Sequence, residues 1–140
     1  MMPEESTTPD LVERMRLMFE AADRADWDGV LRFVAPEAVW EATGLGTSFD
    51  GVAAIRVFLE EWSDPYEDWG LDVEEILDLG DGVTFAVFVQ KGHPVGSTGQ
   101  VQWRHAQVGE WAEGVVVRIT VYADIDEARA AAERLAESRG

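Results

Sequence analysis

Four strand-like segments in the second half of the chain constrain its fold more than any other feature. They are rich in Val, Trp, Thr and Phe and cover residues 71–79, 83–90, 99–111 and 115–122. Glycine-containing connections at residues 80–82 and 112–114 join the outer pairs, and a longer loop around residues 93–98 joins the middle pair. Such connections favour hairpins, so we expect antiparallel neighbouring strands.

The first half of the chain has helical periodicity. Thr8-Pro9 combines a hydroxyl N-cap with proline at the first helical position. Apolar residues then recur at about 3.6-residue spacing, which predicts a helix over residues 9–24. We expect Asp26 to cap a short second helix that Pro36 ends, and residues 39–43 to form a strand.

The remaining segments complete an α+β pattern. Residues 44–48 predict a loop, Asp50 is expected to cap a third helix, and residues 63–70 have turn chemistry. A final helix is expected over residues 126–138, with its cap at Asp124 or Asp126. The predicted order is α-α-β-α-β-β-β-β-α, with the helices on one face of a curved antiparallel sheet.

Composition excludes several functional classes. The 140 residues are enough for one domain with its own core. The net charge of −17 disfavours nucleic acid and anionic membranes as partners. The absence of cysteine removes disulfides, thiolate metal sites and cysteine nucleophiles, and two histidines are too few for a multi-histidine metal site. We therefore expect no metal and no cofactor.

The N-terminal segment indicates where the protein works. MMPEESTTPD has neither the basic nor the apolar region of a secretory signal, and no apolar run in the chain is long enough to span a bilayer. We therefore expect a cytoplasmic protein, with a flexible tail at residues 1–8 and a single domain over residues 9–138.

Several short motifs, in this order and spacing, resemble the nuclear transport factor 2-like superfamily, and within it the SnoaL-like bacterial branch. They are ADWDG at residues 25–29, AVWE at 38–41, FDGVAAI at 49–55, and VRITVY at 117–122 followed by DEA at 126–128. The resemblance covers roughly residues 9–135. It implies a cone in which a curved antiparallel sheet wraps around the N-terminal helices and leaves an apolar pocket, and a homodimer through the outer sheet face.

This superfamily contains ketosteroid isomerases, polyketide cyclases, dehydratases, epoxide hydrolases and non-catalytic binders, so the fold does not settle the function. The isomerase's base, oxyanion tyrosine and neutral acid would fall at Ala42, near Met18 and near Ala106, and none of these residues carries the required group. Arg104 and Arg118 have no acidic neighbour on their own strands, so the aspartate–arginine–aspartate set of the hydrolases has no clear match.

The resemblance also indicates which residues line the pocket. Strand alternation places Trp40 on the same face as Ala42, and that face lines the pocket in the family. The predicted ligand-binding residues are Trp40, Phe58, Trp62, Tyr66, Trp69, Phe85, Trp103 and Ile119. The alternative is that these aromatic and aliphatic residues only fill the core and anchor loops.

His105 is the candidate proton shuttle, because its ordinary pKa of about 6.5 suits a general base. Gln107 shares its strand face, and the two could polarise a carbonyl or activate water. If that face points outward, His105 lies at the dimer interface or in solvent. His93, next to Pro94 in a glycine-rich loop, is expected to be a solvated loop residue.

Residues 60–81 contain ten acidic side chains and no basic one. They indicate a solvated helix end and a charged edge strand, or alternatively the steering of a cationic ligand.

We expect the protein to bind a small, mostly apolar molecule. The alternatives are an isomerase, cyclase or hydrolase acting on a cyclic or polyketide-like substrate, and a structural or regulatory homodimer. The sequence leaves open whether it is an enzyme.

Overall fold

A computed structural model describes residues 10–140. Its elements in chain order are α1 (Leu11–Asp23), α2 (Trp27–Leu31), β1 (Val34–Ala42), a 3-10 turn (Thr43–Leu45), β2 (Thr47–Asp50), α3 (Val52–Ser63), β3 (Tyr66–Gly80), β4 (Val83–Pro94), β5 (Val101–Ala112), β6 (Val115–Tyr122) and α4 (Ile125–Arg139). Asp10 caps α1 by accepting a hydrogen bond from the Glu13 backbone N–H, whereas the predicted Thr8-Pro9 start lies outside the described residues.

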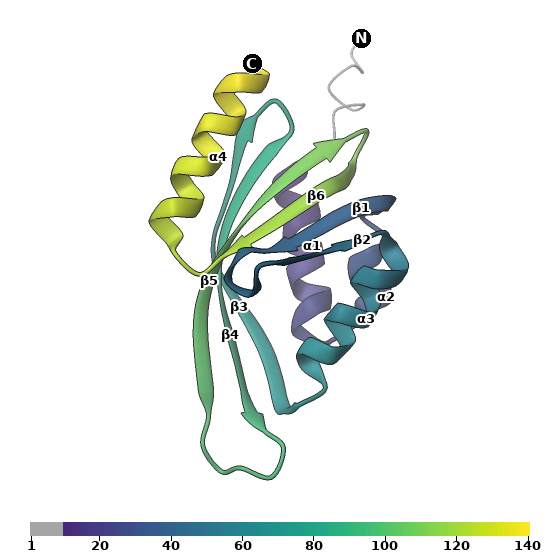
Figure 1. Cartoon of the computed structure of the whole chain (residues 1–140), viewed down its shortest axis with the longest axis vertical. Coiled ribbons are helices and arrows are strands. Elements are labelled where there is room, and N and C mark those ends of the chain that lie inside the picture. Colours follow the sequence, from purple (N-terminus) through teal and green to yellow (C-terminus); the bar gives the residue numbers. More distant parts are fainter. Residues whose placement is uncertain (1–9) are drawn as a thin grey trace.

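The six strands form one curved sheet in the order β2-β1-β6-β5-β4-β3 (Figure 1). Strands β3 to β6 are consecutive antiparallel neighbours, as their connections predicted. Strand β1 pairs with β6 in parallel, so the sheet is not wholly antiparallel. Strand β3 lies at one edge, and the acidic residues along it face solvent for the most part.

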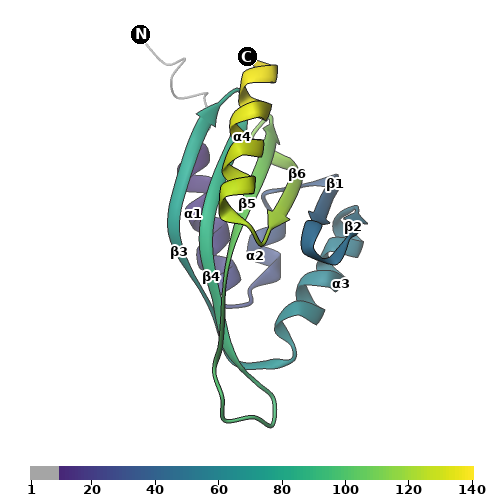
Figure 2. The same ribbon diagram turned by 60° about the vertical axis from the view of Figure 1, so that its left-hand side comes forward.

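Two separate cores pack against the sheet. Helices α1, α2 and α3 lie on its concave side and bury the larger core, which includes Met15, Ile55 and Phe88. Helix α4 lies on the other side and buries Phe85 with Ala128 and Ala132 (Figure 2). The expectation that all helices share one face is therefore wrong for α4. Strand β4 is buried along most of its length because it contributes side chains to both cores.

The first strand begins earlier than its sequence predicted. Asp26 caps α2 as expected, but α2 ends at Leu31 and Pro36 lies inside β1 instead of ending the helix. The β1–β6 register is irregular between Val34 and Val39. Pro36 is tolerated there because its missing N–H falls where the ladder is interrupted.

Three other boundaries also differ from the sequence predictions. The expected loop at residues 44–48 includes the start of β2, which pairs with the end of β1. Gly51, not Asp50, is the N-cap of α3, with a φ of 90° and its N–H donated to the Ala38 carbonyl at 2.7 Å. The expected turn at residues 63–70 contains the start of β3, because β4 extends to Pro94 and pairs with Tyr66. Helix α4 begins after an Asp124 cap, as one of the two alternatives predicted.

Candidate functional site

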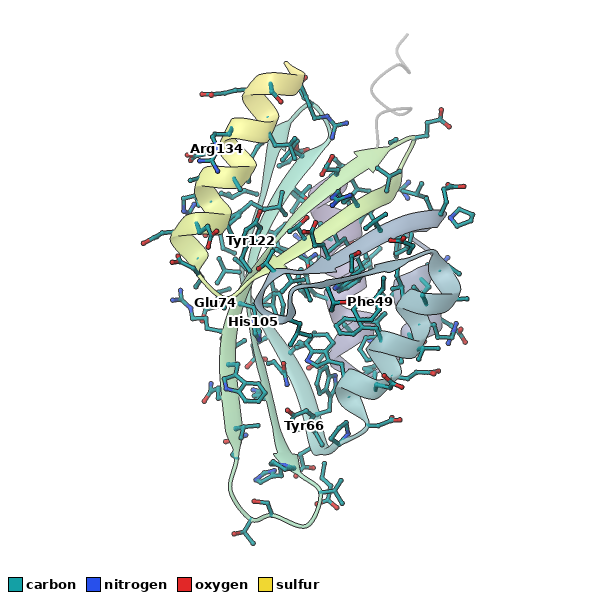
Figure 3. All side chains as sticks on the ribbon, viewed as in Figure 1. Phe49, Tyr66, Glu74, His105, Tyr122 and Arg134 are labelled. Atoms are coloured by element: carbon teal, nitrogen blue, oxygen red, sulfur yellow. The ribbon has the colours of Figure 1, made fainter. Side chains whose placement is uncertain are left out.

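A cavity of about 320 Å³ opens on the concave side of the sheet, beside α3. Its lining residues are Trp40, Ala42, Gly44, Leu45, Phe58, Trp62, Gln90, Trp103, His105, Val121 and Ala123. None of these side chains carries a fixed charge, and His105 is the one titratable group among them. Figure 3 shows Phe49 on the α3 side of the molecule and Arg134 on α4 at the opposite side.

The local periodicities explain how these residues meet. Alternation along β1 turns Trp40 and Ala42 to the concave face, and Phe58 and Trp62 lie one helical turn apart on α3. Strand β5 brings His105 to the same space, where its ring lies 5.5 Å from that of Phe88. The cavity is therefore built from one helix, the turn after β1 and several strands that are distant in sequence.

Phe58 and Trp62 on α3 form one wall of the cavity and belong to a larger aromatic cluster. The Phe58 ring lies 4.4 Å from Phe49 and 6.2 Å from Trp62, with interplanar angles of 21° and 7°. Trp40 packs against the same ring at 6.0 Å, and Trp69 meets Trp62 edge to face at 4.8 Å. Such offset and edge-to-face contacts make a rigid apolar surface suited to a flat ligand.

The polar part of the cavity centres on Gln90, which is 1% exposed. Its side-chain oxygen accepts a hydrogen bond from Trp62 Nε1 at 2.8 Å. Among the described residues, Gln90 Nε2 and Trp40 Nε1 are buried without a hydrogen-bond partner. Both residues line the cavity, but these two nitrogen atoms are shielded from solvent and have no acceptor within residues 10–140.

His105 is half-buried in the cavity lining, and burial lowers the pKa of its imidazole below the usual 6.5. Within residues 10–140 its side chain has no hydrogen-bonding or ion-pair partner. The pKa falls because desolvation penalises the cation and no nearby carboxylate compensates. This lowered pKa favours the neutral form of the His105 imidazole.

This environment predicts a pH effect on stability. The unfolded chain takes up a proton at His105 near pH 6.5 and the folded chain only at lower pH, so His105 costs stability as the pH falls below 6.5. We expect His105→Gln to lose less stability than the wild type between pH 7.5 and 5, as measured by urea denaturation. An NMR titration should place the His105 midpoint below 6.5; a midpoint at or above that value would contradict the burial argument.

The other predicted site residues are not all at the cavity. Tyr66 and Trp69 extend the aromatic cluster at 5.9 Å from each other, and Trp69 Nε1 is anchored to the Ala22 carbonyl at 2.8 Å. Gln107 and Ile119 are buried but do not line the cavity. Phe85 lies in the core beneath α4, on the opposite face of the sheet, with the Arg129 guanidinium 4.6 Å from its ring centre.

Sequence reasoning missed Gln90, Leu45, Val121 and Ala123 as lining residues. Gln90 had a usable signal, because it is the single amide in the apolar run of residues 83–90. Val121 is two residues after Ile119 on the same strand and therefore points to the same face. Because Ile119 was predicted to face the pocket, an inward direction for Val121 could have been inferred. Leu45 had no signal, because its place at the cavity depends on the turn between β1 and β2.

The two arginines considered for catalysis are engaged elsewhere. Arg118 pairs with Glu41 on β1 at 2.5 Å, and Arg104 pairs with Glu74 on β3 at 2.8 Å. Both acidic partners lie on other strands than the arginines they pair with, and neither pair lines the cavity. Among residues 10–140 there is no group of three His, Asp or Glu side chains arranged to hold a metal ion. No helix in that part of the chain is long and apolar enough to cross a membrane.

A curved sheet wrapped around N-terminal helices, with an apolar cavity beneath it, defines the nuclear transport factor 2-like α+β class and confirms the predicted fold. Residues 15–120 match the SnoaL-like domain family, and the chain belongs to that family.

Solved structures with this fold share little sequence with the chain. A nuclear transport factor 2-like protein of unknown function from Burkholderia pseudomallei is 21% identical with a TM-score of 0.69, over 82% of this chain and 91% of its own. A protein with a ketosteroid isomerase-like fold from Catenulispora acidiphila, in complex with trimethylamine, is 14% identical with a TM-score of 0.72, over 89% and 94%. TerC, co-crystallised with polyporic acid, is 18% identical with a TM-score of 0.69, over 88% and 97%. No curated protein gave a significant match.

Proposed function

We propose that this protein binds a small, mostly apolar molecule in the cavity beside α3. The observation that carries the proposal is the cavity itself, about 320 Å³ in volume, without a fixed charge and walled by Trp40, Phe58 and Trp62. Ligand sites typically combine such an apolar lining with a few polar groups that fix orientation. Two structural relatives were solved with trimethylamine and with polyporic acid, which supports small-molecule binding by this fold.

A catalytic role for His105 is the second candidate. Its position in the cavity lining favours it, because a neutral imidazole could take a proton from a bound substrate. Binding alone is better supported, since no described side chain orients His105 as a partner would in an acid–base pair. A purely structural role is less well supported, because side chains do not fill the cavity.

The homodimer stays a prediction, and it would use the outer sheet surface that α4 leaves uncovered.

The experiment closes the cavity without disturbing the core. Gly44 lines the cavity, and a side chain added there meets no atom within 4 Å, so Gly44→Phe should fold and occupy the opening. We expect this variant to bind 2-ethylnaphthalene and 2-acetylnaphthalene at least about tenfold more weakly than the wild type, as measured by saturation-transfer NMR.

Gly99→Phe is the matched control, because Gly99 is outside the cavity lining and its added Cβ would meet only Ser97 Oγ at 3.7 Å. It should bind both naphthalenes as the wild type does. If the wild type binds neither compound, or if the Gly44→Phe variant binds both as tightly as the wild type, ligand binding in this cavity is contradicted.

A further inference from the structure

Two large apolar side chains of the cavity lining are exposed to solvent. Leu45 is 69% exposed and Trp103 is 48% exposed. The buried lining residues, such as Trp40 and Gln90, form the floor of the cavity, so the exposed ones mark its mouth. Single exposed apolar side chains are common on any protein surface, but two of them at the mouth of one cavity indicate contact with what the cavity holds.

Both side chains are carried by anchored segments. Leu45 ends the 3-10 turn after β1, where Thr43 Oγ1 donates a hydrogen bond to the Val121 carbonyl at 2.8 Å. The Trp103 ring meets the Tyr66 ring edge to face, with the ring centres 6.3 Å apart. The two sides of the mouth are therefore positioned before a ligand arrives, which lowers the entropy cost of binding there.

The size of the cavity indicates that a ligand reaches this mouth. At about 320 Å³ the cavity lies near the lower end of the range for small-molecule sites, which is about 300–1,000 Å³. A ligand whose ring system fills the cavity must project any longer substituent through the mouth. The exposed lining residues there are Gly44, Leu45, Trp103 and Ala123, and none of them is charged. The projecting part is therefore apolar where it crosses the mouth.

From these observations, and resting on the proposed function, we infer that the ligand is an aromatic compound that carries an unbranched alkyl chain. Its ring system occupies the cavity, and its chain leaves between Leu45 and Trp103, which set the preference for chain length. The far end of the chain lies in water and can be polar. No covalent step is involved.

The test uses 2-(2-naphthyl)ethanol, 4-(2-naphthyl)butan-1-ol and 6-(2-naphthyl)hexan-1-ol, which differ only in the length of the chain before the terminal hydroxyl. Complete burial of one methylene group is worth about fourfold in affinity, and burial on one side about twofold. We expect the wild type to bind the hexanol about 10–20-fold more tightly than the ethanol in isothermal titration calorimetry. A ratio below about threefold would overturn the inference and leave the proposed function standing, whereas absence of binding by all three would overturn both.

Variants then locate the chain. In the double variant Leu45→Ser, Trp103→Ser we expect the ratio of the two dissociation constants to fall below about threefold, because no large apolar side chain remains at the mouth. Both side chains are exposed, so the double variant should fold, and circular dichroism checks this. Val95→Ser is the matched control, since Val95 is 64% exposed but lies outside the cavity lining, and it should keep the wild-type ratio.

Three results with these variants would overturn the assignment of the chain to the mouth. The first is a wild-type ratio in the double variant or, if that variant does not fold, in both single variants. The second is loss of the ratio in Val95→Ser. The third is a change from dimer to monomer in the double variant with an unchanged ratio, measured by sedimentation velocity, which would assign Leu45 and Trp103 to contact with a second copy of the chain.

Discussion

Replacing Phe88 with alanine is expected to lower the free energy of unfolding by about 3–5 kcal/mol. Phe88 is 2% exposed at the centre of β4, and its ring packs 5.3 Å from Phe19 on α1. Truncation removes the contact between helix and sheet and leaves a void that β4, packed on both faces, is poorly able to close. Urea denaturation followed by circular dichroism measures the change.

Phe33→Ala is the matched control. Phe33 is partly exposed and lies next to the Arg14 and Arg32 guanidinium groups, so its loss should cost less than half as much. A loss below about 1 kcal/mol for Phe88→Ala would mean that the concave core repacks around the missing ring, contrary to the close packing described above.

The second large effect is expected at Gly109. A Cβ added there would lie 2.6 Å from Thr84 Oγ1 and 3.1 Å from Trp111 Nε1, two buried atoms that share a 3.0 Å hydrogen bond. Gly109→Ala must displace one of them, which combines overpacking with the loss of a buried hydrogen bond. We expect a loss of about 2–4 kcal/mol in unfolding free energy.

Gly99→Ala serves as the control for this substitution, because its added Cβ has no contact closer than 3.7 Å. Its stability should change by no more than about 1 kcal/mol. If the two alanine variants unfold at the same urea concentration, the close approach of β5 to Thr84 is not a constraint on residue 109.

Local sequence patterns were sufficient to predict the hairpins but not which side of the sheet each helix covers. The glycine connections at residues 80–82 and 112–114 define turns whatever surrounds them, so the antiparallel order of β3 to β6 could be predicted. The position of α4 could not, because residues 83–90 are apolar on both faces and show no alternation that would reveal a single buried side. Val117 alternates in phase with Ile119 along β6, but a register shift between β5 and β6 leaves it exposed.

The candidate site was predictable where a side chain's direction follows from its own strand or helix. Alternation placed Trp40 inward, and the α3 stripe placed Phe58 and Trp62 together, as the structure has them at the cavity. The prediction that Phe85 lines the pocket is wrong, because Phe85 points into the core beneath α4. Residues of β4 enter both cores, and the sequence does not show which residue enters which core. The importance of Gln90 depends on the Trp62 indole, a contact across 28 residues that no local pattern indicates.

The parallel pairing of β1 with β6 has a consequence for how the protein folds. Thr43 Oγ1 donates a hydrogen bond to the Val121 carbonyl at 2.8 Å across 78 residues, where both segments border the cavity. Joining such distant segments requires a large loss of chain entropy before any contact compensates for it, which gives this part of the molecule a high contact order. The cavity is therefore complete only after the rest of the sheet has assembled, and binding competence should be the last native property that a refolding chain acquires.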